Sequence, residues 1–160
     1  MGKIPILTEQ AWQKIKHYCN YSERCHFEVK EKLYAMGLPK KQVEVLICRL
    51  IDENLLNEER FARMFAGGHF RQKKWGRTKI IYALRQKKLG ENLIKMALRE
   101  IETADYTASL QKLAAAKWKT LDSETLVSKQ ARTRAYLLQK GYESGLIQAV
   151  IKELSCGKKD

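Results

Sequence analysis

Proline and glycine are scarce in this chain, and their scarcity narrows the fold class. Pro5 and Pro39 are the only prolines among 160 residues, and the nine glycines are widely spread. Alternating runs of β-branched residues are also rare, whereas apolar residues recur at steps of three and four almost throughout. This spacing predicts an all-α protein without a sheet.

Long apolar runs are missing as well. None approaches the roughly 20 residues that a membrane-spanning helix requires. Met1–Leu7 is too short for a signal peptide and lacks a small-residue cleavage site. Ile6 stands where the myristoylation pattern requires serine or threonine. We therefore expect a cytoplasmic protein with no membrane partner.

Cysteine pairs at metal-binding spacing are absent. The four cysteines are Cys19, Cys25, Cys48 and Cys156. In a reducing compartment we expect free thiols that are mostly buried as small apolar groups. His17, Cys19, Cys25 and His26 are the one set that could be imagined as zinc ligands, but their spacing does not match the usual finger patterns. We expect no metal and no cofactor.

The sequence also lacks a recognisable catalytic set. No glycine-rich phosphate loop followed by Lys-Ser or Lys-Thr occurs, and no serine or cysteine has an evident base nearby. Asp52, Glu53, Glu58 and Glu59 lie close together, but they fall at a helix end and the next helix start, where capping explains them. A metal-dependent nuclease built on them is the residual alternative. We expect no catalysis and no small-molecule substrate.

Positive charge, in contrast, is abundant. The chain has 31 lysines and arginines against 18 carboxylates, a net charge of +13. From Arg71 to Arg99 there are ten basic residues and a single carboxylate, Glu91. Such an excess is typical of nucleic-acid binders, although an acidic protein groove or an anionic membrane surface fits it too. An ordinary solvated helix face is the plainest alternative.

An internal repeat organises the apolar residues. Leu33, Leu84 and Leu137 lie 51 and 53 residues apart, and apolar residues recur at the same offsets after each of them. The three copies read Leu38, Val43, Leu46, Ile47 and Leu50; then Leu89, Ile94, Ala97, Leu98 and Ile101; then Tyr142, Ile147, Val150, Ile151 and Leu154. The pattern predicts a helix, a tight turn and a second helix written three times, each with a leading helix in front.

Stacked units of this kind share their cores, which predicts an elongated, curved array with a long concave edge. We expect repeats at 8–56, 57–102 and 103–155, followed by a frayed tail at 156–160. Thr8, Ser22 and Asn57 are the expected helix starts, and Pro39 is expected in a first turn. Gly67-Gly68 within a helix predicts a kink or a close backbone approach, with a plain helix end as the alternative.

Two helical patterns meet at Trp75-Gly76, with positive charge on both sides. Lysine and arginine neutralise phosphates, and interleaved aromatics suit single strands, whose bases are free to stack. A role for Trp75 as a core or corner residue competes with a stacking role. The predicted binding residues are Arg71, Lys73, Lys74, Trp75, Arg77, Lys79, Tyr82, Arg85, Lys87 and Lys88.

Five stretches carry a resemblance to a known family: Ser22-Glu23-Arg24, Leu55–Ala62, Trp75–Ile80, Leu84–Lys87 and Tyr136–Tyr142 followed by Ile147. Through them the chain resembles the RecX family of bacterial regulators of the RecA recombinase. Lys88 stands where the family tends to have glycine, Ala83 where it has glutamate and Asn57 where it has aspartate.

The resemblance implies three tandem three-helix units that bind in the groove of the RecA–single-stranded-DNA filament. There such proteins restrain ATP hydrolysis, coprotease activity and strand exchange, without a catalytic site of their own. The expected partners are the RecA filament and single-stranded DNA, with weaker binding to duplex DNA. No dimer signature is present, so we expect a monomer. A stand-alone helical module that binds DNA or RNA, with no obligatory protein partner, is the alternative.

Overall fold

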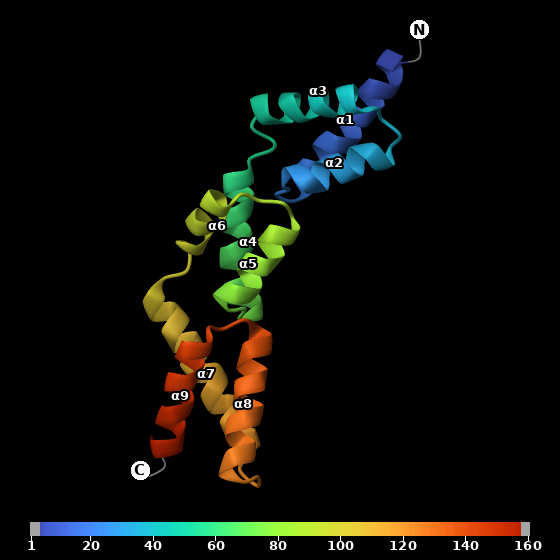
Figure 1. Ribbon diagram of the computed structural model, residues 1–160. Helices are drawn as coiled ribbons and strands as arrows, with labels where there is room; N and C mark the ends of the chain where they lie inside the picture. The colour runs from blue at the N-terminus through green and yellow to red at the C-terminus, as the bar shows by residue number, and fades with distance from the viewer. Residues whose placement is uncertain (1–3, 158–160) are drawn as a thin grey trace. The chain divides into compact units, whose positions relative to one another are not determined.

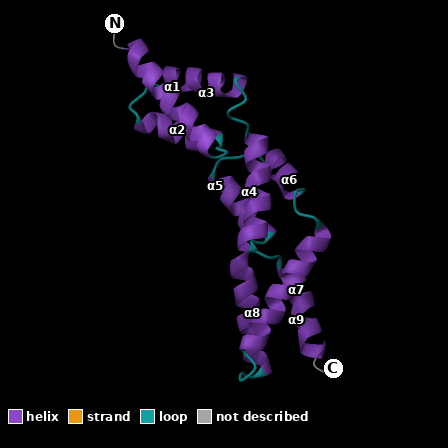
Figure 2. Cartoon of the chain, turned by 180° about the vertical axis from the view of Figure 1, so that it is seen from behind, coloured by secondary structure: helices purple, strands orange, loops and turns teal. Residues whose placement is uncertain are grey.

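The computed structural model describes residues 4–157, with side chains from Thr8 onward. These residues form nine helices and no strand, so the predicted all-α class is confirmed (Figures 1 and 2). The helices are α1 (Ile4–Tyr21), α2 (His26–Ala35), α3 (Lys40–Asp52), α4 (Glu58–Lys73), α5 (Arg77–Gln86), α6 (Glu91–Leu98), α7 (Thr103–Thr120), α8 (Leu126–Lys140) and α9 (Ser144–Cys156). None of them combines the length and the apolarity that crossing a bilayer demands.

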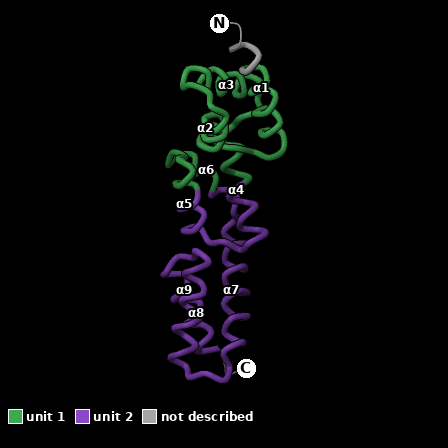
Figure 3. The backbone as a smooth tube through the Cα atoms, turned by 90° about the vertical axis from the view of Figure 1, so that its right-hand side faces the viewer, with its two compact units in different colours: residues 1–64, 84–97 green, residues 65–83, 98–160 purple. Residues whose placement is uncertain are grey.

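The chain divides into two compact units, which Figure 3 shows in different colours. Unit 1 contains the described residues up to Met64 together with Leu84–Ala97, and unit 2 contains Phe65–Ala83 and the described residues from Leu98 onward. Helices α4 and α5 contribute residues to both units.

Each unit has an apolar core of its own. In unit 1, Trp12 and Ile15 of α1 pack with Leu33 of α2 and with Leu46 and Leu50 of α3. In unit 2 the helices α7, α8 and α9 pack together. Their buried residues include Tyr106, Leu110 and Trp118 from α7, Leu137 from α8 and Ile147 from α9.

The predicted repeat is confirmed by burial. Leu33, Leu84 and Leu137 are each 0% exposed, and the residues five positions later, Leu38, Leu89 and Tyr142, are buried as well. The apolar residues at the later offsets are buried, except Leu98 and Leu154, which are half-buried. The repeated apolar positions therefore form the buried face of three helix–turn–helix pairs. The curvature of the array stays a prediction.

The turn is also repeated. Gly37, Lys88 and Gly141 have φ angles of +83°, +63° and +97°, the left-handed region. After Lys88 the amide of Leu89 donates to the Leu84 carbonyl, and after Gly141 the amide of Tyr142 donates to the Leu137 carbonyl. These bonds satisfy carbonyls that a helix end leaves without partners.

Two expected helix starts are wrong. Helix α1 begins at Ile4 rather than Thr8, and Pro5 fits into its first turn because a first-turn amide needs no partner. Helix α2 begins at His26 rather than after Ser22. There the Cys25 amide donates to Glu28 (3.3 Å), and the His26 amide donates to Glu58 (3.1 Å). Two glutamates therefore satisfy the α2 amides that Ser22 was expected to cap.

Of the other predicted helix boundaries, one is confirmed and two are wrong. Asn57 caps α4 as predicted, because its Oδ1 accepts from the Arg60 amide at 3.0 Å. Pro39 is the N-cap of α3 rather than a residue of its first turn. The helix end considered at Gly67-Gly68 is wrong, since α4 runs on to Lys73. A Cβ on Gly67 would lie 2.7 Å from the Arg71 guanidinium, so a side chain rather than another backbone fills that space.

Helix α5 ends at Gln86. The predicted frayed tail begins at Cys156, which still belongs to α9. From Lys158 onward that tail lies outside the described residues.

Candidate functional site

The basic corner between α4 and α5 is built on a left-handed residue. Lys74 has a φ of +59°, and its amide donates to the Phe70 carbonyl at 3.0 Å, which ends α4. The chain then turns through Trp75 and Gly76 into α5. The predicted Trp-Gly corner is therefore present, and Lys74 supplies its unusual backbone conformation.

A second turn packs directly against this corner, within unit 2. The Gly76 amide donates to the Lys140 carbonyl at 2.7 Å, and the Thr78 amide donates to the Gly141 carbonyl at 2.9 Å. A Cβ on Gly76 would lie 2.3 Å from the Gly141 carbonyl carbon and oxygen. Glycine is thus required at this backbone contact, which joins the corner to the turn between α8 and α9.

Trp75 is half-buried and lies between apolar and charged neighbours. Its ring packs against His69, with centroids 4.5 Å apart, and meets Phe65 edge-on at 6.4 Å. The ammonium groups of Lys79 and Lys73 lie 4.7 and 5.6 Å from its ring centroid. Trp75 therefore holds the corner together and also presents two cations around its indole.

Lys140 joins the corner although the sequence did not single it out as a binding residue. Its Nζ donates to the Lys73 carbonyl at 3.2 Å, and the neighbouring Gln139 carbonyl accepts from Lys79 Nζ at 3.4 Å. No signal in the sequence places Lys140 here, because the two bonded residues are 67 positions apart. We refer to Lys73, Lys74, Trp75, Lys79 and Lys140 as the corner cluster.

Arg77 is engaged with the protein itself. Its guanidinium pairs with Glu143 at 2.8 Å and lies 3.9 Å from the centre of the Tyr106 ring. The Arg77 amide donates to the Tyr106 hydroxyl at 2.9 Å, and that hydroxyl in turn donates to Glu143. Burial, reinforced by the bond to Glu143, raises the pKa of Tyr106. The phenol therefore stays protonated as a donor.

The other predicted site residues of unit 2 are exposed. Arg71 lies in the last turn of α4, and Tyr82 on α5 is 66% exposed. Arg71 also lines a hollow of about 450 Å³ with Lys74, Lys112 and Asp105. Unit 2 thus brings seven of the ten predicted residues into one compact body.

The remaining three belong to unit 1. Arg85 pairs with Glu91 through two hydrogen bonds, at 2.8 and 3.1 Å. This pairing raises the pKa of Arg85 and lowers that of Glu91. Lys87 lies 3.6 Å from Glu28, and Lys88 is exposed at its left-handed position. Two of these three cations therefore have a carboxylate partner inside unit 1.

Only half of the cysteines are buried, whereas most were expected to be. Cys19 and Cys25 are buried as expected, whereas Cys48 and Cys156 are exposed. Within the part of the chain that the structure describes, no three histidines, cysteines or carboxylates come together in a way that would hold a metal ion.

Family models match two stretches of the chain. The model described as "RecX, second three-helix domain" matches residues 57–98, and "RecX, third three-helix domain" matches residues 104–151. The first of these stretches contains all ten predicted site residues, and the second contains Lys140 and Gly141.

Curated relatives carry the same family name. A "Regulatory protein RecX" from Prosthecochloris aestuarii is 30% identical over 149 residues, covering 92% of this chain and 95% of the relative. One from Oceanobacillus iheyensis is 24% identical over 91% of this chain and 53% of the relative. One from Clostridium perfringens strain 13 is 31% identical over 80% and 60% respectively. The chain thus spans about half to three fifths of the length of the latter two.

Solved structures show the same fold. The crystal structure of RecX from Lactobacillus salivarius superposes with a TM-score of 0.85 at 22% identity, covering 96% of this chain and 99% of that one. A second crystal structure of regulatory protein RecX gives a TM-score of 0.81 at 21% identity, covering 92% and 72% respectively.

Proposed function

The chain belongs to the RecX family, and from that premise we propose that it is a non-enzymatic regulator of RecA. It binds the filament that RecA forms on single-stranded DNA and restrains ATP hydrolysis, coprotease activity and strand exchange. A protein that binds one state of a filament more tightly than another shifts the filament between them, so this regulation requires binding alone.

The observation that carries the proposal is the corner cluster. Lys73, Lys79 and Lys140 come from three helices: Lys73 and Lys79 lie over the Trp75 ring, and Lys140 bonds to the Lys73 carbonyl. The Glu143 carboxylate nearby is already paired with Arg77. Among the described residues no carboxylate forms an ion pair with Lys73, Lys79 or Lys140. Their charge is therefore available to an external anion, and phosphates of a nucleoprotein filament are such anions.

The predicted binding residues have unequal roles in this proposal. Lys73, Lys74, Lys79 and Lys140 contact the filament directly, whereas Arg77 holds the corner to Glu143 and Tyr106. Arg71 and Tyr82 extend the same surface in unit 2. Arg85, Lys87 and Lys88 form a second contact in unit 1, where only Lys88 has no carboxylate partner among the described residues.

The test measures ATP hydrolysis by purified RecA on single-stranded DNA, with this protein added near stoichiometry. We compare the wild type with a variant carrying Lys73→Glu, Lys74→Glu and Lys79→Glu. Arg77 is left unchanged because a carboxylate in its place would face Glu143, and the loss of this ion pair would confound the result. The matched control carries Lys30→Glu, Lys119→Glu and Lys152→Glu, three exposed lysines with the same change in net charge.

We expect the wild type and the control to inhibit hydrolysis, and the corner variant to lose inhibition. If both variants inhibit like the wild type, the corner cluster is not the filament contact. If all three proteins leave RecA unaffected yet bind DNA with a steep dependence on salt, the chain is a stand-alone nucleic-acid-binding module instead.

A further inference from the structure

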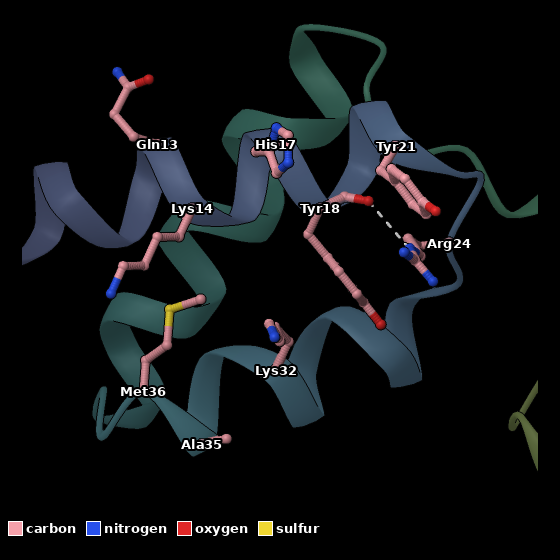
Figure 4. Close-up of a pocket in the computed structure, with 9 residues that line it drawn as sticks. All are labelled: Gln13, Lys14, His17, Tyr18, Tyr21, Arg24, Lys32, Ala35 and Met36. Carbon is pink, nitrogen blue, oxygen red and sulfur yellow. Dashed lines mark hydrogen bonds between the residues drawn. The ribbon is translucent and has the colours of Figure 1, made fainter.

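A cleft between α1 and α2, within unit 1, lies outside the predicted site. Its volume is about 690 Å³, within the range of small-ligand pockets. Figure 4 shows the side chains that line it, contributed by α1, by the segment that follows α1, by α2 and by Met36 directly after α2. They are Gln13, Lys14, His17, Tyr18, Tyr21, Arg24, Lys32, Ala35 and Met36.

The charged lining of this cleft is entirely basic. Lys14, Arg24 and Lys32 line it, and no carboxylate does. Three carboxylates near the cleft in sequence have other partners. Glu23 pairs with Arg60 at 2.6 Å, Glu28 accepts from the Cys25 amide at 3.3 Å and lies 3.6 Å from Lys87, and Glu9 accepts from Gln13 at 3.2 Å. The cleft therefore presents three cations that lack an internal counter-charge among the described residues.

Aromatic rings interleave with these cations. The Arg24 guanidinium lies 3.8 Å from the centre of the Tyr18 ring, and Lys32 Nζ lies 5.3 Å from it. Arg24 is also fixed by a hydrogen bond from its Nε to the Tyr18 carbonyl, at 3.1 Å, the dashed line in Figure 4. Tyr21 is 81% exposed, so its ring is available to a ligand.

We propose that this cleft binds a short stretch of single-stranded nucleic acid. Lys14, Lys32 and the fixed guanidinium of Arg24 hold phosphates, and a base stacks on Tyr21. An acidic peptide would satisfy the lysines equally well but would leave the exposed ring unused. The combination of flat aromatic and basic groups therefore favours a nucleotide strand.

This inference is independent of RecA, because the cleft belongs to unit 1 and shares no residue with the corner cluster. The test is fluorescence anisotropy of a labelled thymidine oligonucleotide with the full chain, at several salt concentrations and without RecA. The variants are Tyr21→Ala, Tyr21→Phe and the pair Lys14→Gln with Lys32→Gln. The controls are Tyr34→Ala, at a tyrosine of α2 that is 45% exposed outside the cleft, and the pair Lys30→Gln with Lys40→Gln.

We expect Tyr21→Ala to weaken binding by about 5- to 150-fold, the equivalent of about 1–3 kcal/mol for one stacked base. Tyr21→Phe should keep the affinity, because stacking requires the ring and not the hydroxyl. The lysine pair should lower the slope of log affinity against log salt by about 1.4, since each phosphate contact on a single strand contributes about 0.7. Both controls should match the wild type.

If Tyr21→Ala binds like the wild type, the proposal is overturned. If, in addition, the lysine pair weakens binding and a polyglutamate peptide displaces the oligonucleotide, the cleft is a site for acidic peptides instead. Neither result tests the proposed role of the corner cluster, which is tested by the inhibition of RecA.

Discussion

Replacing Gly76 by alanine tests the backbone contact on which the corner cluster is built. Gly76 is buried, and a Cβ there would lie 2.3 Å from the carbonyl carbon and oxygen of Gly141 and 2.5 Å from the Tyr142 amide nitrogen. All three are backbone atoms, which cannot rotate away as a side chain can. The corner must therefore move off the turn between α8 and α9, and the hydrogen bonds from Gly76 to Lys140 and from Thr78 to Gly141 are lost.

The expected loss follows from these two effects. Forcing an extra methyl group into a close-packed site costs about 1–3 kcal/mol, and each hydrogen bond contributes about 0.5–1.5 kcal/mol. Gly76→Ala should therefore lower the free energy of unfolding by about 2–6 kcal/mol, a large fraction of the roughly 5–15 kcal/mol typical of a domain. Urea unfolding followed by circular dichroism measures the change.

Gly68→Ala is the matched control. Gly68 lies inside α4, and a Cβ there would meet no heavy atom within 4 Å. Alanine is the better helix former by about 1 kcal/mol, so Gly68→Ala should stabilise the protein. If Gly76→Ala unfolds within about 0.5 kcal/mol of the wild type while Gly68→Ala stabilises as expected, the backbone contact at the corner is refuted.

Three further predictions concern the turns, the buried phenol and the thiols. Lys88→Gly should raise the free energy of unfolding by about 0.5–1 kcal/mol in urea, because glycine adopts the φ of +63° without strain, and Lys87→Gly should give no such gain. Tyr106→Phe should lower it by about 1–3 kcal/mol, because the Arg77 amide and Glu143 each lose a partner, and an unchanged unfolding midpoint would contradict the network. Burial raises the pKa of Cys19 to about 11 and that of Cys25 to about 12, so a thiol reagent at pH 8 should modify the exposed Cys48 and Cys156 in the native protein. All four thiols should react once it is unfolded, and rapid reaction of all four in the native protein would show that Cys19 and Cys25 are accessible.

The fold was predictable because the spacing of apolar residues along the sequence is enough to reveal the repeat. Leu33, Leu84 and Leu137 recur at nearly equal intervals, and the burial of each follows from helical periodicity alone. The start of α2 was not predictable in that way. Ser22 is a good capping residue, but the His26 amide finds its acceptor in Glu58, which is 32 positions away. A local partner, Glu28, and a distant one, Glu58, thus overrode the capping preference of Ser22.

The candidate site was predictable as a charge run but not as an arrangement. Which cations have internal partners depends on distant carboxylates: Arg77 meets Glu143, and Lys87 meets Glu28. A count of basic residues along the sequence does not distinguish Arg77 and Lys87, which have a carboxylate partner, from Lys73 and Lys74. Lys140 shows the opposite effect, because folding adds to the corner a cation that lies outside the run. Counting charges along the chain therefore finds the region and misses the division of roles within it.

Stability and binding at the corner can be separated because one glycine pair assembles the cluster and other residues carry its charge. Gly76 and Gly141 bring Lys140 to Lys73, whereas the side chains of Lys73, Lys74 and Lys79 supply cations. Lys79 also shares in the contact through its backbone, which packs on Gly141. The charge-reversed corner variant should therefore keep most of its stability and lose filament inhibition. Gly76→Ala removes no cation, yet it should lose inhibition in proportion to the displacement of Lys140. If it unfolds more readily but inhibits RecA at wild-type strength below its unfolding transition, the lysines act singly and their assembly around Trp75 is irrelevant to binding.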